Sequence, residues 1–395
     1  MPLGIYISVP FCRTKCSYCN FASDVFSRAV FERYVDRVCA DIENAPLVAV
    51  EMGGEIERAV DSIYLGGGTP TVLEAGQLER VFATVRRRFD VQPDAEVTVE
   101  CAPGTLTQAV VESLLRCGVN RVSLGVQSFV DQEAAAVGRL HKRATVLGDI
   151  ARLRAAGIAN INVDLIAGLP YQTAESWEFS LRETVATGAG HVSVYMLEVD
   201  EDSRLGRELM AGGKRYHAHF VPDEEAMADF YLVACEELNA AGIAQYEISN
   251  FSREGFESRH NLKYWTRQPY LGFGVDAHSM LVSAAPDIEA VRFAAPDSLE
   301  QYMNKRGLQR TEVSHRAALE ESFFLGLRLN RGVNLRELSA EFGEEAIENA
   351  RAAIAEFVEG GLMERRGDLV CLTARGRLLS NEVFEKFILM DGVVR

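Results

Sequence analysis

The sequence lacks an apolar run long enough to cross a membrane, and it is poor in cysteine. No stretch approaches the ~18 consecutive apolar residues that a membrane-spanning helix needs. The first twelve residues contain no Lys or Arg, which fits neither a secretory signal peptide nor a transit peptide. Eight cysteines in 395 residues are too few for a disulfide framework and indicate a reducing compartment. We therefore expect a cytoplasmic protein without a transmembrane segment, and peripheral contact with a membrane stays open.

Positive charge is also scarce. The chain has 41 Lys and Arg against 57 Asp and Glu, which gives a net charge of −16 at pH 7. Such a surface repels phosphate backbones, so we expect no nucleic-acid partner. With 48% hydrophobic and 25% charged residues, the composition is that of a folded globular protein. At ~100 to 200 residues per domain, this length predicts about two domains.

Short apolar runs alternate with helical patterns over the first 215 residues. Apolar residues recur with helical spacing at Phe31, Val35, Val38 and Ile42, which predicts an amphipathic helix. The alternation predicts a parallel barrel or an open doubly wound sheet with right-handed crossovers. The predicted strands are residues 4–9, 62–65, 97–100, 121–126, 161–165 and 191–197.

The regular alternation of short apolar runs and helical patterns ends near residue 220. The pattern predicts a long helix over 223–241, a strand near 245–249, and a loop-rich connection over 283–310. From residue 316 onward it predicts three helices, a hairpin at 365–372 and a last helix to residue 389, which resembles a winged helix. Residues 316–395 hold 11 basic and 14 acidic side chains, so packing or a lid role is expected rather than DNA binding. We expect three parts: 1–220, 221–310 and 311–395.

Three of the cysteines lie close together. Cys12, Cys16 and Cys19 follow the first predicted strand, and thiolates favour zinc or an iron-sulfur cluster. A structural zinc site would need a fourth ligand nearby, yet the next cysteine is Cys39 and the first histidine is His141. Three ligands leave one metal position open, where an iron of a [4Fe-4S] cluster can chelate an amino acid. A zinc knuckle and three unrelated buried cysteines remain the alternatives. The other five cysteines are isolated and are given no chemical role.

Polar or glycine residues follow the next four predicted strands. Residues 66–70 read Gly-Gly-Gly-Thr-Pro, where bare backbone can approach a ligand. Glu100, Gln127 and Asp164 end the third, fourth and fifth predicted strands. In a β/α barrel the carboxyl ends of the strands form the active face, so these residues should converge on the cysteine loop.

A second candidate site lies in the string His-Asn-Leu-Lys-Tyr-Trp at residues 260–265. Imidazole is a common axial ligand of haem iron, and aromatic planes suit a flat macrocycle. The alternative is a histidine that is merely packed among aromatic side chains. His217 and His219 are expected to be solvent-facing turn residues.

Several strings together resemble a known family. The cysteine loop with Tyr18 resembles the signature of the radical S-adenosylmethionine (SAM) superfamily. Pro-Phe-Cys, Gly-Gly-Gly-Thr-Pro-Thr, Gly-Val-Gln-Ser, Gly-Arg-Leu-His and Asp-Leu-Ile-Ala-Gly-Leu-Pro occur in the order of the oxygen-independent coproporphyrinogen oxidase family. This resemblance implies an α/β fold, a partial (β/α)6 barrel of the radical SAM type, with a mainly helical, winged-helix-like C-terminal domain. It also implies a [4Fe-4S] cluster on the three cysteines. The residues that it implies for SAM binding are Tyr6, Gly67, Gly68, Thr69, Glu100, Gln127, Arg139 and Asp164, with Glu198 and His278 near the adenosine.

Two departures point away from the oxidase itself. Phe21 stands where the oxidase has an additional cysteine, and the oxidase's N-terminal extension has no counterpart ahead of Cys12. The string at 260–265 resembles that of the haem-chaperone branch, which implies haem ligation by His260 beside Asn261, Tyr264 and Trp265. We therefore expect a haem carrier that binds a cluster, SAM and haem. Its acceptors would be haem-dependent proteins such as respiratory enzymes or a haem-storage protein. Radical decarboxylation of a porphyrinogen and radical opening of the haem macrocycle are the alternatives.

Overall fold

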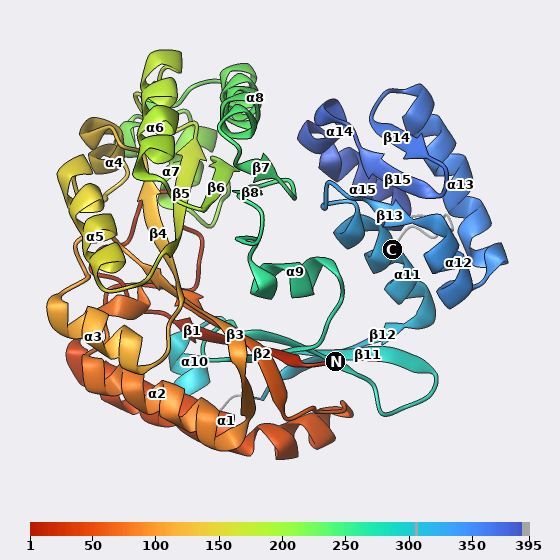
Figure 1. The fold of residues 1–395 in the computed structure, drawn as a ribbon, viewed down its shortest axis with the longest axis horizontal. Coiled ribbons are helices and arrows are strands. Elements are labelled where there is room, and N and C mark those ends of the chain that lie inside the picture. Colours follow the sequence, from red (N-terminus) through yellow and green to blue (C-terminus); the bar gives the residue numbers. More distant parts are fainter. Residues whose placement is uncertain (305–306, 389–395) are drawn as a thin grey trace.

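Six parallel strands form the centre of the molecule. The computed structural model describes residues 1–304 and 307–388. Its main sheet has the order β12-β11-β10-β9-β1-β2-β3-β4-β5-β6-β8-β7, and β1 to β6 run parallel as a partial barrel (Figure 1). All six predicted strands are confirmed. They are β1 (Leu3–Val9), β2 (Ala59–Gly67), β3 (Asp90–Cys101), β4 (Arg121–Gln127), β5 (Asn160–Ala167) and β6 (His191–Met196).

Helices cover the outside of this barrel. On α1, the predicted stripe of Phe31, Val35, Val38 and Ile42 is buried in the core against the sheet. The helices between and after the parallel strands are α1 (Arg28–Met52), η1 (Pro70–Val72), α2 (Ala75–Arg88), α3 (Gln108–Arg116), α4 (Asp131–Ala136), α5 (Arg143–Ala155), α6 (Ala174–Thr187), α7 (Arg204–Met210), η2 (Arg215–Phe220) and α8 (Glu224–Ala240).

The chain then extends both edges of the sheet. Strand β9 pairs parallel with β1, and β10, β11 and β12 follow antiparallel. The prediction of a loop over 283–310 is wrong, because β11 is held there by pairing with β10 and β12 rather than by a strong local pattern. The elements are β7 (Ala244–Gln245), β8 (Asn250–Ser252), α9 (Arg259–Trp265), β9 (Tyr270–Phe273), β10 (His278–Val282), β11 (Ile288–Ala294), α10 (Leu299–Met303) and β12 (Gln309–Ser314).

The last segment has a core of its own. Three helices and a hairpin pack around residues such as Phe323, Ile347 and Phe387, as predicted. The expected end of the last helix at residue 389 lies outside the described residues. The elements are α11 (His315–Gly326), β13 (Val333–Asn334), α12 (Leu335–Phe342), α13 (Glu344–Glu359), β14 (Met363–Arg366), β15 (Leu369–Leu372), α14 (Ala374–Leu378) and α15 (Ser380–Ile388). The three-part division of the chain stays a prediction, since the main sheet runs across residue 220.

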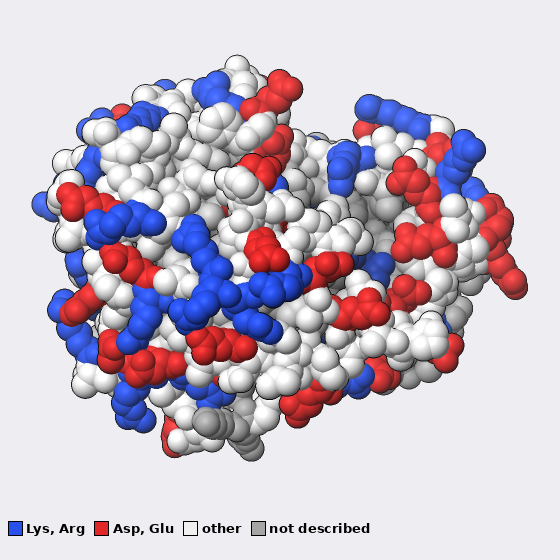
Figure 2. Space-filling model, turned by 60° about the horizontal axis from the view of Figure 1, so that its bottom comes forward, with Lys and Arg blue, Asp and Glu red and all other residues white. Residues whose placement is uncertain are grey.

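The surface carries both signs of charge. On the face in Figure 2, Lys and Arg lie interspersed with Asp and Glu. Ion pairs between neighbouring helices, such as Arg80 with Glu32 (2.6 Å) and Arg116 with Glu79 (2.6 Å), account for part of this mixture. Among the described residues, no helix combines the length and the apolar composition that crossing a membrane requires.

Candidate functional site

The three cysteines lie on the loop that leaves β1. Cys12, Cys16 and Cys19 are half-buried free thiols. The N–H of Cys12 donates to the carbonyl of Asp24 (3.0 Å), and the N–H of Ser17 donates to the carbonyl of Val137 (3.1 Å). The loop is therefore held both by its own continuation and by the residue that follows α4.

Glycine at the end of β2 allows this loop to approach the sheet. A Cβ on Gly68 would lie 2.7 Å from the carbonyl oxygen of Phe11 and 3.0 Å from Sγ of Cys12. Thr69 follows, and its Oγ1 lies 3.8 Å from the same sulfur. The glycine triplet was expected to expose backbone to a ligand, and its geometry shows that Gly68 also makes room for the cysteine loop.

Glu100 lies near the carboxyl end of β3 and faces the barrel interior. It accepts hydrogen bonds from the hydroxyl of Tyr64 (2.8 Å) and from the N–H of Gly67 (3.1 Å). Burial is the main cause that raises the pKa of Glu100 to about 7, and the nearby Asp164 adds to it. Near neutral pH this group is therefore close to the midpoint of its ionisation.

Asp164 faces the same interior from β5. Its carboxylate accepts hydrogen bonds from Ser123 Oγ (3.0 Å) and Asn162 Nδ2 (2.7 Å), and burial raises its pKa. The prediction that Asp164 ends the fifth strand is wrong, because residues 165–167 continue β5 by pairing with β6. Asp164 thus lies deeper in the barrel than expected.

Gln127 and Arg139 meet beside β4. Gln127 ends the strand with a positive φ of 68°. A Cβ on Gly125 would lie 3.0 Å from Nη2 of Arg139 and 3.3 Å from Nε2 of Gln127, so both side chains border this glycine. Arg139 also donates to the hydroxyl of Tyr18 (2.9 Å), which links this part of the barrel to the cysteine loop.

The remaining residues expected at SAM lie partly inside the barrel and partly at its rim. Tyr6 lies on β1 with its ring centroid 6.2 Å from that of Tyr64. Glu198 follows β6 and His278 opens β10, and both side chains are exposed. The structure therefore groups Tyr6 with the interior residues and leaves Glu198 and His278 at the rim.

The histidine string lies at the opposite end of the barrel, on α9. His260 Nδ1 is 3.0 Å from Ser62 Oγ, and Ser62 pairs in register with Gly4 near the start of β1. Gly67, by contrast, pairs with Val9 at the end of β1. At ~3.3 Å per residue, the five steps from Ser62 to Gly67 separate these levels by about 16 Å. His260 therefore lies at the end of the barrel away from the cysteine loop. The rings of Tyr6 and Tyr64 lie between the two candidate sites, with centroids 6.5 Å and 5.4 Å from that of His260.

His260 is enclosed in this conformation. The residue is 1% exposed, and its Nε2 lies 2.9 Å from the hydroxyl of Tyr264. Burial, aided by the charges of Lys263 and Arg121, lowers the pKa of His260 to about 3, so the imidazole is neutral at physiological pH. Both ring nitrogens have partners, and an incoming metal would have to displace one of them.

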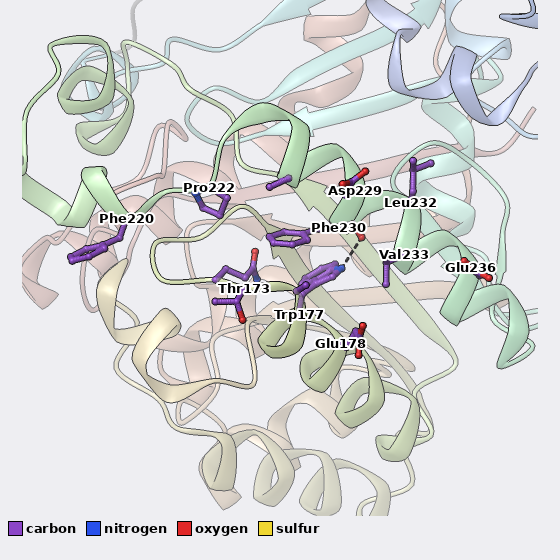
Figure 3. A pocket seen from close by; sticks show the side chains of 13 residues that line it. Thr173, Trp177, Glu178, Phe220, Pro222, Asp229, Phe230, Leu232, Val233 and Glu236 are labelled. Atoms are coloured by element: carbon purple, nitrogen blue, oxygen red, sulfur yellow. Dashed lines mark hydrogen bonds between the residues drawn. The ribbon is translucent and has the colours of Figure 1, made fainter.

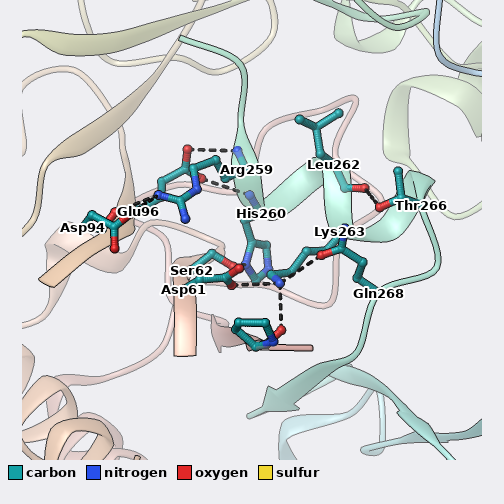
Figure 4. A network of polar contacts seen from close by, with 11 residues as sticks. Asp61, Ser62, Asp94, Glu96, Arg259, His260, Leu262, Lys263, Thr266 and Gln268 are labelled. Atoms are coloured by element: carbon teal, nitrogen blue, oxygen red, sulfur yellow. Dashed lines mark hydrogen bonds and ion pairs between the residues drawn. The ribbon is translucent and has the colours of Figure 1, made fainter. Parts of the chain in front are cut away.

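A polar network holds α9 against the barrel, as Figure 4 shows. Glu96 accepts the backbone N–H groups of Arg259 (3.0 Å) and His260 (3.1 Å), and buried Lys263 pairs with Asp61 (2.8 Å). Sequence reasoning missed Glu96, although its alternation with Thr98 and Glu100 on β3 is a usable signal for one polar face.

The other members of the string have separate surroundings. The ring of Trp265 lies under the guanidinium of Arg328, 4.2 Å away, at the contact with the C-terminal domain. Asn261 is half-buried, and its N–H is capped by Ser258. Of the four residues expected at haem, the structure thus brings His260 and Tyr264 into direct contact, and Trp265 faces the C-terminal domain.

A cavity of about 660 Å³ lies elsewhere, between α6 and α8 (Figure 3). Trp177 and Phe230 form part of its wall, and the indole N–H of Trp177 donates to the carbonyl of Phe230 (2.7 Å). It belongs to the outer helical layer and shares no residue with the two candidate sites.

The chain resembles known proteins over nearly its full length. The radical SAM superfamily matches residues 6–183, and the HemN C-terminal domain matches residues 313–379. The heme chaperone HemW of Bacillus subtilis is 33% identical over 390 residues, which cover 97% of this chain and 98% of that protein. The chain belongs to the HemW family. HemW of Escherichia coli is 31% identical over 396 residues, 98% of either chain.

A solved structure confirms the expected fold. Coproporphyrinogen III oxidase (HemN) of Escherichia coli has a TM-score of 0.82 with this chain at 23% identity, covering 98% of this chain and 90% of that one. The expected radical SAM barrel with its C-terminal domain is therefore confirmed. Membership in the radical SAM superfamily implies a [4Fe-4S] cluster and SAM as cofactors of this HemW-family chain.

The cysteine loop offers three thiols, the ligand type of an iron-sulfur cluster. Within the ranges that the structure describes, no three His, Cys, Asp or Glu side chains converge on one point where an ion could bind. A structural zinc ion needs four ligands at ~2.0–2.3 Å from one atom. A [4Fe-4S] cluster takes each thiolate on a different iron, so its three cysteine sulfurs stay apart. The three thiols of this loop thus match the ligand type of the cluster that the radical SAM superfamily implies.

Substituting alanine for Gly68 should impair cluster loading. The added Cβ would overlap with the Phe11 carbonyl and the Cys12 sulfur, an overpacking that costs about 1–3 kcal/mol. We expect lower iron content after anaerobic reconstitution, measured per mole of protein. Gly76→Ala on α2 is the matched control, because a Cβ there meets nothing within 4 Å. Equal iron content in the two variants would contradict this role for Gly68.

SAM affinity should rise with pH through about 7. The raised pKa of Glu100 means that its carboxyl is largely protonated below that pH, and a protonated carboxyl cannot pair with a cation. We expect binding about tenfold weaker at pH 6 than at pH 8, measured by equilibrium dialysis with cluster-loaded protein. Glu100→Gln should bind weakly at both pH values, whereas exposed Glu112→Gln should keep the wild-type profile. A flat wild-type profile would contradict the placement of Glu100 beside a cationic group of SAM.

Proposed function

We propose that this protein is a haem chaperone that holds a [4Fe-4S] cluster and SAM, binds haem and transfers it to haem-dependent proteins. The observation that carries the proposal is the full-length similarity to heme chaperone HemW of Bacillus subtilis. In this proposal Cys12, Cys16 and Cys19 hold the cluster. A cytoplasmic location, peripheral membrane contact, and acceptors such as respiratory enzymes or a haem-storage protein stay predictions.

The proposed SAM site uses the polar interior at the carboxyl ends of the strands. When bound, cluster and SAM together supply one-electron reductive chemistry at the sulfonium group. The backbone of Gly67, Gly68 and Thr69 would border its methionine part. Tyr64 holds Glu100 in place, and Ser123 with Asn162 orients Asp164. The remaining contacts would come from Tyr6, Gln127 and Arg139, with Glu198 and His278 toward the adenosine.

The proposed haem ligand is His260. Its pKa of about 3 keeps the imidazole neutral, the form that binds iron. In the tautomer protonated at Nδ1, the Nδ1–H donates a hydrogen bond to Ser62 Oγ and Nε2 carries the lone pair. That lone pair faces the hydroxyl of Tyr264, so ligation requires the hydroxyl to leave Nε2. Asn261 and Trp265 would border the macrocycle after this movement.

The competing function is oxidative decarboxylation of a porphyrinogen, the reaction of the oxidase whose fold this chain shares. Phe21 argues against it, since a 63% exposed aromatic ring stands where the oxidase has its additional cysteine. Anaerobically reconstituted protein should be given SAM, a reductant and either haem or coproporphyrinogen. We expect stoichiometric, stable haem binding and no multiple turnover. Catalytic formation of protoporphyrinogen without stable haem binding would overturn the proposal.

A further inference from the structure

Arg121, the first residue of β4, is a buried cation without a hydrogen-bond partner for its Nε in the part of the chain that the structure describes. The residue is 1% exposed. Among the described residues, no carboxylate lies within ion-pair distance of its guanidinium, and Glu100 and Asp164 interact with its charge from farther away. The neighbouring strand contributes Thr98, which pairs with Arg121 in register, is fully buried, and also has no partner for its Oγ1.

Three other arginines with a buried Nε that lacks an acceptor in the described chain are paired through another nitrogen of the guanidinium or through a nearby carboxylate. Arg139 donates to Tyr18 (2.9 Å), Arg292 pairs with Glu321 (3.0 Å), and Arg328 pairs with Glu247 (3.5 Å). A guanidinium removed from water without an acceptor is costly, and buried polar groups that remain unsatisfied call for a specific explanation. A donor pair formed by Arg121 and Thr98 matches the oxygen atoms of a carboxylate.

The pair lies at the α9 end of the barrel. Ser62, which contacts His260, pairs with Glu96, and Thr98 is two residues further along the same strand. The charge of Arg121 reaches His260, because it contributes, after burial and Lys263, to the lowered pKa of that histidine. The cluster end of β4 is Gln127, six residues away or about 20 Å at ~3.3 Å per residue. The charge of Arg121 also reaches Glu100 and Asp164, since it partly offsets the raised pKa of each. Arg121 therefore lies between the α9 end of the barrel and the polar interior.

We propose that Arg121, with Thr98, binds a propionate carboxylate of haem when His260 holds the iron. The inference rests on the proposed function, because haem is the cargo. Haem carries carboxylates at one edge of an otherwise apolar macrocycle. One propionate would enter the α9 end of the barrel while the ring stays against α9.

The test compares haem with its dimethyl ester, which lacks both carboxylates, at one detergent concentration. Wild-type protein should prefer haem by about tenfold or more, the range of a charge-assisted hydrogen bond. Arg121→Gln should bind the two compounds equally, and Arg121→Lys should keep part of the preference. Arg259→Gln is the matched control, because that side chain is partly exposed and pairs with Asp94 instead. Without ligand, Arg121→Gln should still fold, since the guanidinium makes no hydrogen bond or close ion pair among the described residues.

The outcomes separate the two proposals. If wild-type protein binds neither compound, the haem-chaperone function itself fails. If wild-type protein binds haem and ester equally, or if Arg121→Gln keeps the full preference, the propionate site fails while the function stands. Loss of the preference in Arg259→Gln rather than in Arg121→Gln would also overturn the assignment.

Discussion

Replacing Cys16 by serine should abolish the brown chromophore and remove most of the iron from anaerobically reconstituted protein. The physical reason is that a serine hydroxyl stays protonated at neutral pH and cannot replace a thiolate on iron. The same result is expected for Cys12 and Cys19, because each would hold a different iron of the cluster. Iron and sulfide per mole of protein, together with the visible absorption spectrum, measure the effect.

Two other cysteines provide the matched controls. Cys39 on α1 and Cys235 on α8 pack against the core and lie apart from the loop. Their serine variants should retain the full cluster content. Stoichiometric zinc without iron in the anaerobic wild-type protein, or unchanged iron in all three loop variants, would refute the cluster assignment.

Removing the imidazole of His260 should abolish the haem Soret band or shift it strongly, because the iron loses its axial nitrogen. Tyr264→Phe should act in the opposite direction. It removes the hydroxyl that occupies Nε2, which should strengthen haem binding by about fivefold, the value of one net hydrogen bond. Haem titration followed by absorption spectroscopy measures both variants.

The buried position of His260 requires a check on folding. His260→Gln keeps a group that can bond to Ser62, so it complements His260→Ala, and both should retain the cluster, which lies at the other end of the barrel. His217→Ala is the control, since that histidine is exposed and bonds to Tyr171. A wild-type Soret spectrum and affinity in both His260 variants would contradict ligation by this residue.

The barrel was predictable because the apolar runs in the sequence coincide with the parallel strands of the sheet. Each parallel strand is an apolar run bounded by turn residues, and parallel strands place their carboxyl ends together. Residues such as Glu100 and Gln127 could therefore be assigned to one face. Strand β11 was missed because its pairing partners lie outside its own stretch of sequence, and Asp164 was misplaced because the end of β5 depends on β6.

The α9 site shows what a linear pattern cannot supply. The string around His260 indicates a candidate ligand. The end of the barrel at which this histidine lies depends on the path that the chain takes between β8 and α9. Ser62, which bonds to the imidazole, and Glu96, which accepts the backbone N–H of His260, lie 198 and 164 residues earlier in the chain. The unpaired charge of Arg121 is likewise visible only after its neighbours are known.

Transfer of haem to an acceptor is the step that distinguishes a haem chaperone from a haem-modifying enzyme. Haem-loaded protein should be separated from free haem and mixed with an excess of a haem-free acceptor, such as an apo-haem protein with a distinct Soret maximum. We expect the acceptor spectrum to appear as the haem leaves this protein stoichiometrically. His260→Ala should deliver no haem, because it does not bind haem in the first place. Haem that stays bound in the presence of the acceptor, or that is converted to another tetrapyrrole during the incubation, would contradict a chaperone function.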